Sequence, residues 1–229
     1  VLYLYTNSFL MKIQEVVKVL EDWAPLTYAE EYDNVGLLVG DTQKTCTGIL
    51  ITIDSIENVV DEAINKKYNL IVSFHPIIFS GIKKLTGENY VQKTMIKAIK
   101  NDIAIYAIHT ALDKHKFGVN YKISEMIGLK KTKILMPEKN SLKKLTTYIP
   151  ENKADMLLQK IHGVGGGKIG NYEECSFKID GTGSYKGNKI SNPYIGKKSI
   201  KQNVKEVQIN VLFLKHLQKK ILETLFKYH

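Results

Sequence analysis

Two apolar segments that each run into a potential metal ligand constrain the fold of this chain most strongly. They are residues 69–76 (NLIVSFHP) and residues 103–113 (IAIYAIHTALD). Short β-branched runs of this kind are typical of strands buried on both faces. In an open α/β sheet, ligands bind at the carboxyl ends of the strands. The sequence therefore predicts that His75, His109 and Asp113 approach one crevice.

Each of these side chains also has an ordinary structural interpretation. Pro76 holds His75 extended, so its imidazole is either a ligand for zinc, iron or manganese or a hydrogen-bond partner of a loop. Asp113 is either a ligand or a helix cap or Asx-turn. His109 is a candidate for orienting a ligand through a hydrogen bond. His115 lies in a basic loop and is expected to be solvated.

Four further features carry weaker signals. Asp54 ends another predicted strand and either joins the cluster or caps the next helix. The acidic residues of loop 30–33 are interpreted as solvated. The glycine-rich stretch 163–170 lacks the ending of a phosphate-binding loop and is predicted to be a flexible hairpin or turn. Cys175 has no base beside it in sequence and is predicted to be a buried structural thiol.

The order of the predicted elements divides the chain in two. In the first part, predicted helices (12–23, 58–67 and 92–100) alternate with predicted strands, which indicates βαβ units and a mainly parallel sheet. The second part reads strand, helix, strand, strand, helix, at about 142–150, 154–162, 177–179, 206–213 and 215–227. This order is the signature of a ferredoxin-like α+β unit. The boundary is predicted at 137–141, where Pro137 and Asn140 break the pattern.

The composition of the chain limits the kinds of binding partner and the cellular location that can be expected. The net charge is +10, from 33 basic and 23 acidic residues, and the basic residues are lysines spread along the chain. Because arginine is the usual carrier of base and phosphate forks, a nucleic-acid partner is disfavoured and a lysine-rich solvated surface is expected. Two cysteines are too few for a disulfide framework, which favours a cytoplasmic location. No stretch reaches the roughly 20 apolar residues that span a membrane, so no membrane partner is expected.

The start of the chain is atypical. Residues 1–11 are largely apolar but lack the basic start and small-residue cleavage site of a signal peptide. Met11 opens a clean helical pattern. The segment is therefore interpreted as non-native or as a leader, and no function is expected of it.

Six groups of residues, in order, resemble the NIF-three-like family, whose members are often labelled homologues of type 2 GTP cyclohydrolase I. They are YDNVGLLVG (32–40), FHPIIF (74–79), HTALD with GVN (109–113 and 118–120), TYIP (147–150), GKIGNYEECSF (167–177) and GTG (181–183). The resemblance runs from about residue 12 to the end. It implies the N-terminal half of an α/β domain at 12–138, followed at 141–229 by an inserted ferredoxin-like α+β domain similar to the PII and CutA proteins.

The resemblance also implies a two-metal site between the halves of the principal domain, in a ring-shaped homo-oligomer. His75 corresponds to the second histidine of the family's His-His-Pro, and Asp113 corresponds to its bridging carboxylate. Phe74 replaces the first histidine and cannot bind a metal. The remaining ligands, a histidine and a glutamate, lie in a C-terminal half that is expected to be missing beyond Tyr228 and His229.

Two functions follow as expectations. The first is a hydrolase-like protein in which divalent ions (zinc, iron or manganese) lower the pKa of a bound water, with a metal site that is incomplete in this chain. The alternative is a non-catalytic regulatory or partner-binding protein with transcription-related interactions, in which the inserted domain is the contact surface. The sequence names no substrate and leaves open whether a reaction is catalysed.

Overall fold

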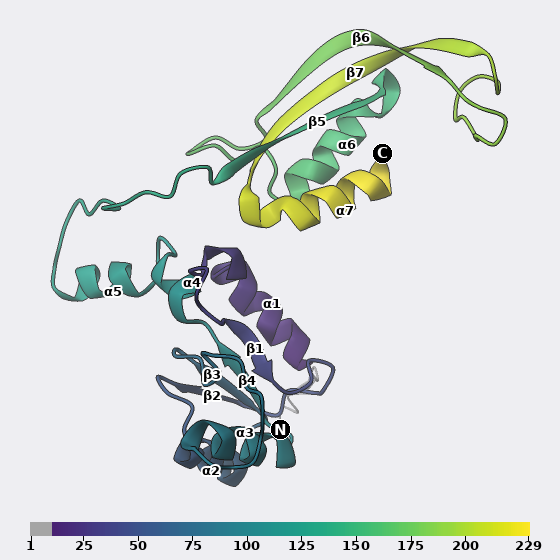
Figure 1. Ribbon diagram of the computed structural model, residues 1–229. Coiled ribbons are helices and arrows are strands. Elements are labelled where there is room, and N and C mark those ends of the chain that lie inside the picture. Colours follow the sequence, from purple (N-terminus) through teal and green to yellow (C-terminus); the bar gives the residue numbers. More distant parts are fainter. Residues whose placement is uncertain (1–10) are drawn as a thin grey trace, which may run out of the picture. The chain divides into compact units, whose positions relative to one another are not determined.

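The computed structural model describes residues 11–229, which divide between Lys133 and Ile134 into two compact units (Figure 1). Both units are mixed α/β. Within the described residues, no helix has the length and apolar character needed to cross a membrane.

The first unit is built on a four-stranded sheet in the order β1-β4-β3-β2. The strands are β1 (Gly36–Val39), β2 (Ile49–Thr52), β3 (Leu70–Ser73) and β4 (Ala104–Ala107). The strands β2, β3 and β4 are parallel, as predicted, and Leu50, Ile71 and Ile105 lie in register across them. β1 pairs antiparallel with β4. Strand direction depends on long-range pairing, so the local pattern of residues gave no signal for it.

Helices cover both faces of this sheet (Figure 1). They are α1 (Ile13–Trp23) on one face, and α2 (Glu57–Lys66) with α3 (Tyr90–Lys100) on the other. Successive strand residues point to opposite faces, so Leu70 and Val72 pack in the α1 core while Ile71 packs in the α2 and α3 core. This double burial explains why β3 and β4 are continuous apolar runs, with all four residues of each strand buried.

Three short helices flank the sheet of the first unit in the sequence. A 3-10 helix, Leu26–Tyr28, precedes β1, and α4 (His109–Asp113) follows β4 almost directly. α5 (Val119–Met126) comes next and contains no buried residue. The sequence pattern predicted neither α4 nor α5.

The second unit is a three-stranded antiparallel sheet, in the order β5-β7-β6, with two helices packed on one face. Its elements are β5 (Leu142–Pro150), α6 (Glu151–Gly163), β6 (Ser176–Lys186), β7 (Lys201–Leu214), a 3-10 helix (Lys215–Leu217) and α7 (Gln218–Tyr228). The strand-helix-strand-strand-helix order agrees with the sequence. The core lies between the helices and one sheet face, and it includes Leu157, Ile161, Ile209, Phe213 and Ile221.

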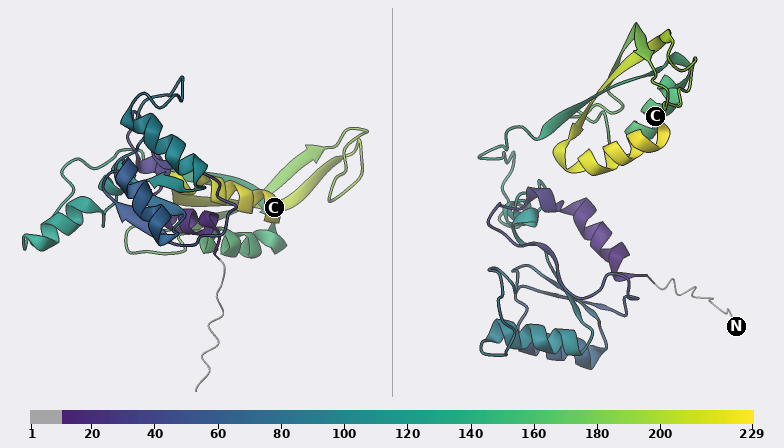
Figure 2. Two further views of the ribbon diagram at one scale, coloured as in Figure 1. Left: turned by 90° about the horizontal axis from the view of Figure 1, so that it is seen from below. Right: turned by 45° about the vertical axis from the view of Figure 1, so that its right-hand side comes forward.

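Two of these strands are much longer than the apolar pattern indicates. β6 and β7 pair continuously from Ser176 opposite Val211 to Lys186 opposite Lys201. The outer part of this hairpin extends beyond the helices (Figures 1 and 2). Its residues are mostly polar, and backbone pairing rather than core burial holds them.

The glycine-rich stretch after α6 is a turn, as predicted, but backbone hydrogen bonds fix it. Gly167 N–H donates to the carbonyl of Leu212 at 2.7 Å, and Cys175 N–H donates to the carbonyl of Gly167 at 2.9 Å. Gly167 has a φ of +77°, which favours glycine at this point. Cys175 is free and only half-buried, so the prediction of a buried thiol is wrong: its turn lies at the sheet margin.

Candidate metal centre

Backbone pairing beyond the ends of β3 and β4 brings the two predicted histidines together. Ile108 N–H donates to the carbonyl of Ser73 at 3.0 Å, and His109 N–H donates to the carbonyl of Phe74 at 2.9 Å. The parallel ladder therefore continues up to the histidines. The imidazole rings of His75 and His109 lie edge to face, with their centroids 5.4 Å apart.

A carboxylate from the neighbouring strand end holds His75. The distance from His75 Nδ1 to Asp54 Oδ1 is 2.8 Å. A proton on Nδ1 donates this hydrogen bond, which leaves the lone pair of the neutral ring on Nε2. Among the described residues, His75 Nε2 has no hydrogen-bond partner. Of the two interpretations of Asp54, joining the cluster agrees with the structure, since α2 begins without a side-chain cap.

A second carboxylate, Asp33, holds His109 in the same way. His109 Nδ1 lies 3.0 Å from Asp33 Oδ1, and the Asp33 side chain is fully buried. Asp33 also accepts hydrogen bonds from the backbone N–H groups of Asn34 and Thr110 and from the Thr110 hydroxyl. The solvated interpretation of the acidic loop is therefore wrong for Asp33, because the loop before β1 carries this side chain inward.

Asp33 is ionised in this environment. Burial raises the pKa of its carboxyl, but the hydrogen bonds from His109, Thr110 and Asn34 together outweigh burial and lower the pKa below its usual value. Periodicity gave no signal for this residue. The Asp-Asn pair before a strand was the only local hint, since the side chains of Asp and Asn often accept hydrogen bonds from nearby backbone N–H groups.

Asp113 is the last residue of α4 and lies near enough to both histidines for their charges to influence its carboxyl. Burial raises the pKa of its carboxyl; His109 and His75 act against this shift, and the Asp33 carboxylate adds to it. Among residues 11–229, the Asp113 carboxylate has no hydrogen-bond partner. The interpretation as a cap at a helix start is wrong, since Asp113 lies at the helix end. A carboxylate there opposes the helix dipole, which is an arrangement more typical of a functional site than of a stabilising one.

Aromatic rings pack against the histidines both inside and outside the cluster. The Phe74 ring lies 5.1 Å from that of His75 and 5.4 Å from that of His109, so it forms an apolar wall of the cluster. His115 lies outside the cluster and packs against Trp23 and Phe117, with ring centroids 6.3 and 6.1 Å away. Burial lowers the pKa of His115. His115 is therefore partly buried against aromatic rings, where the sequence predicted plain solvation.

The cluster is short of donors for a closed metal site. Within residues 11–229, no three His, Cys, Asp or Glu side chains are arranged to hold an ion together. The chemistry of the donors nevertheless fits a divalent cation, because each imidazole is oriented by a carboxylate on the nitrogen that faces away from a ligand.

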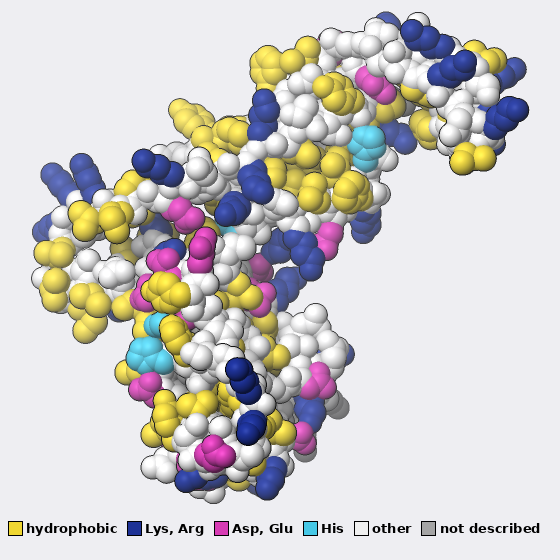
Figure 3. Space-filling view, in the orientation of Figure 1, with side chains coloured by type: hydrophobic (Ala, Val, Ile, Leu, Met, Phe, Trp, Pro, Cys, Tyr) yellow, Lys and Arg dark blue, Asp and Glu magenta, His cyan; other side chains and the backbone are white. Residues whose placement is uncertain are grey.

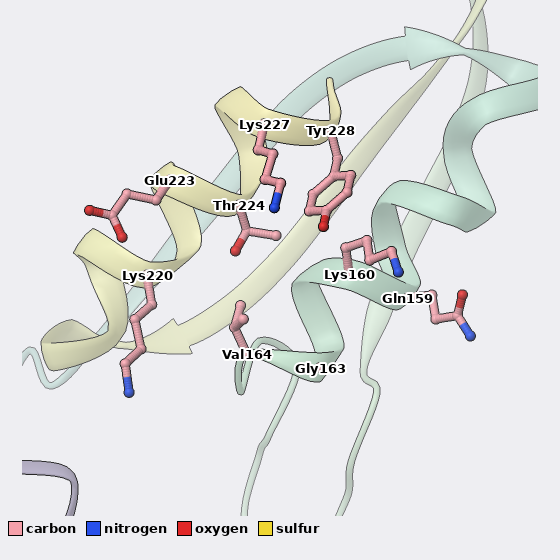
Figure 4. Close-up of a pocket in the computed structure, with 9 residues that line it drawn as sticks. All are labelled: Gln159, Lys160, Gly163, Val164, Lys220, Glu223, Thr224, Lys227 and Tyr228. Atoms are coloured by element: carbon pink, nitrogen blue, oxygen red, sulfur yellow. The ribbon is translucent and has the colours of Figure 1, made fainter. Parts of the chain in front are cut away.

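The hollow between α6 and α7, of about 640 Å³, has different chemistry (Figure 4). Its lining includes Lys160, Lys220 and Lys227 but only one carboxylate, Glu223. The amino groups of Lys160 and Lys227 lie 5.5 and 5.2 Å from the centre of the Tyr228 ring. Lys160 and Lys227 therefore pack against the Tyr228 ring. The lining of the hollow offers a single carboxylate, so it does not supply a pair of metal ligands.

The chain is similar to proteins named GTP cyclohydrolase 1 type 2 homolog. It is 34% identical to that of Bacillus subtilis over 217 residues, and 36% identical to that of Staphylococcus aureus (strain Mu50) over 219 residues. These matches cover 94% and 96% of this chain but only 58% and 60% of the relatives. The chain thus spans under two thirds of their length.

Solved structures agree with this similarity. A Bacillus cereus protein related to NIF3 matches with a TM-score of 0.79 and 34% identity, over 97% of this chain and 59% of the other. Staphylococcus aureus protein SA1388 matches with a TM-score of 0.64 and 32% identity, over 96% and 56%. Residues 11–221 also match the family described as Duf34/NIF3 (NGG1p interacting factor 3), and the chain belongs to this family.

Proposed function

We propose that this chain supplies part of a divalent-metal site in a hydrolase-like protein. His75 is a ligand through Nε2, Asp113 is a ligand through its carboxylate, and His109 supports them. The observation that carries the proposal is the hydrogen bond of 2.8 Å between His75 Nδ1 and Asp54 Oδ1, which leaves Nε2 as the nitrogen available to a ligand. Carboxylate–imidazole pairs of this kind fix the tautomer and raise the basicity of metal-binding histidines.

The donor set favours zinc, iron or manganese, since imidazole and carboxylate ligands suit these ions. A bound divalent ion of this class lowers the pKa of its water and so supplies a nucleophile near neutral pH. The residues of this chain hold the ligands in place: Asp54 orients His75, and Asp33 fixes His109 beside it. Phe74 covers one side of the imidazoles and limits the access of water there.

The ligand count sets the expected affinity. Catalytic zinc sites usually take three protein ligands and a water, whereas His75 and Asp113 are two. We expect the remaining ligands to come from the part of the longer relatives that this chain does not match, within a self-associated protein. This chain alone is therefore expected to bind metal weakly and to show no detectable turnover. A stoichiometric ion that stays bound through dialysis, measured by elemental analysis, would contradict that expectation.

Manganese titration followed by NMR tests the ligands even when binding is weak. The ring signals of the six histidines are recorded while Mn²⁺ is added, because the paramagnetic ion broadens signals close to it. We expect the signals of His75 and His109 to broaden before those of the other histidines. His75→Gln should remove the early broadening of His109, whereas the control His229→Gln should leave it unchanged.

Two variants separate ligands from supporting groups. Asp54→Asn should weaken Mn²⁺ binding by about 10- to 100-fold, as expected for the loss of an orienting partner. Asp113→Asn should abolish the early broadening at both histidines. Equal broadening of all six histidines in the unchanged protein, or full binding by Asp113→Asn, would sink the proposal.

A second candidate function is regulatory partner binding without catalysis. A hollow of about 550 Å³ in the second unit is lined by exposed Phe177 and Ile179 together with Leu212 and Ile169, which is an apolar surface of the kind that binds proteins. The family description also names an interaction with NGG1p. On this view His75→Ala and Asp113→Ala keep partner binding in a pull-down assay, whereas deletion of residues 141–229 abolishes it. Loss of the partner in His75→Ala would count against this candidate.

A further inference from the structure

The outer β6–β7 hairpin, residues 181–205, is a strongly basic segment of the second unit. This basic hairpin contains no Asp or Glu and has six lysines: Lys186, Lys189, Lys197, Lys198, Lys201 and Lys205. Among the residues that the structure describes, none of these lysines forms an ion pair. Several dark blue side chains accordingly appear, among white and yellow ones, at the projecting end of the second unit at the upper right of Figure 3.

One face of the hairpin is already occupied by its own loop. The Tyr185 hydroxyl donates a hydrogen bond to the carbonyl of Ile195, and Ser199 N–H donates to the carbonyl of Gly187 at 2.7 Å. Gly196 lies so close to Gln202 that an added Cβ would be 2.5 Å from that side chain. The loop therefore folds back over the Tyr185 and Gln202 side of the strands.

The other face is exposed and polar, and at its inner end Lys205 borders a hollow that Glu151 of α6 also lines. It consists of three directly opposed pairs, all exposed, namely Thr182 with Lys205, Ser184 with Asn203 and Lys186 with Lys201. Like charges directly opposite each other destabilise a sheet, so the pairing of Lys186 with Lys201 costs stability in the free protein. An anionic partner that lies between the two ammonium groups removes this cost.

We propose that this open face binds the phosphate backbone of a double-stranded nucleic acid, without reading its sequence. Lysine, serine, threonine and asparagine are among the side chains that contact nucleic-acid phosphates. A two-stranded β-ribbon also has the width that the major groove of B-DNA admits. The hairpin projects beyond α6 and α7, so its outer part is free to approach a duplex (Figure 2).

The composition of the open face favours a nucleic acid over an anionic membrane. Binding to a membrane surface scales with buried apolar area in addition to charge. The six side chains of the open face include no apolar residue, and the exposed apolar side chains of the hairpin, Ile190, Tyr194 and Ile200, lie outside this face in the loop. The absence of arginine, which disfavours base readout, does not affect phosphate contacts by lysine, because lysine binds phosphate as a point charge.

Salt dependence of duplex binding tests the proposal with the full chain. The affinity for a fluorescent 20-base-pair DNA is measured by anisotropy at several salt concentrations between about 50 and 200 mM. Each phosphate contact contributes about −0.9 to the slope of log affinity against log salt. The slope of the triple variant Lys186→Ala/Lys201→Ala/Lys205→Ala should therefore be shallower by about 2.7. Between about 50 and 200 mM salt, the unchanged protein should lose affinity by a factor about 40 times larger than the factor for this variant.

A matched triple variant controls for net charge. Lys130, Lys131 and Lys133 are exposed lysines of the first unit, and their replacement by alanine removes the same charge. This control should keep the slope of the unchanged protein, and the hairpin variant should unfold at a temperature no lower than that of the unchanged protein, because the repulsion between Lys186 and Lys201 is removed. Equal losses in both triples, or no salt-dependent binding of the unchanged protein, would overturn the proposal. Binding to phosphatidylserine vesicles without binding to the duplex would replace the nucleic acid with a membrane and would also overturn it.

Discussion

Asp33 is the residue that joins the loop before β1 to the end of β4. It accepts four hydrogen bonds, from Asn34 N–H, Thr110 N–H, the Thr110 hydroxyl and His109 Nδ1, while its own side chain is fully buried. A buried carboxylate is tolerated only when it is satisfied in this way. The position of His109 in the cluster therefore depends on a charge that belongs to another part of the sheet.

Replacement of Asp33 by asparagine keeps the shape and removes the charge. One side-chain acceptor becomes a donor that faces other donors, so Asp33→Asn should destabilise the protein by about 2–3 kcal/mol in urea unfolding. The control Asp180→Asn, at an exposed position on β6, should change stability by less than about 0.5 kcal/mol. Equal effects of the two substitutions would show that the Asp33 network contributes nothing.

The same residue predicts a dependence on pH. The folded-state pKa of Asp33 is lowered, so its contribution is complete above the unfolded value of about 3.9 and is lost as pH falls through the folded value. Acidification below about pH 4 should therefore narrow the stability difference between the unchanged protein and Asp33→Asn. A difference that stays constant down to pH 2 would contradict this.

At the scale of elements, residue patterns predicted what local burial determines. The β-branched runs at 70–73 and 104–107 are strands because both faces of the sheet are covered, and His75 and His109 come together because parallel strands end at one edge. The antiparallel direction of β1 and the length of the β6–β7 hairpin depend on backbone pairing between distant segments. Such pairing leaves no periodicity in the sequence.

The connection between α4 and α5 also depends on one close approach. A Cβ on Gly118 would lie 1.9 Å from the carbonyl oxygen of Leu112, in the last turn of α4. Gly118→Ala should therefore push the end of α4 away, displace Asp113 and weaken Mn²⁺ binding along with thermal stability. Gly163→Ala is the control, since nothing lies within 4 Å of its added methyl group. Unchanged metal binding in Gly118→Ala would show that Asp113 does not depend on this contact.

At the scale of the whole molecule, the hydrophobic cores are separate. Buried residues between Ile13 and Ala111 form two clusters on the faces of one sheet, and those between Leu145 and Ile221 form a third cluster. No buried apolar residue lies between these two spans. Each unit therefore has its own core and its own sheet, as separately folding domains do.

Limited trypsin digestion should therefore cut the chain first between the two spans. Lys130, Lys131, Lys133 and Lys139 are all exposed there, and exposed polar connections are preferred sites of cleavage. We expect two resistant fragments by mass spectrometry, and two-step unfolding of the intact chain in urea, because the cores are lost independently. A matched variant with these four lysines replaced by glutamine should resist the first cut and still unfold in two steps. Early cleavage within both cores, or a single transition followed by every probe, would show that the units fold as one.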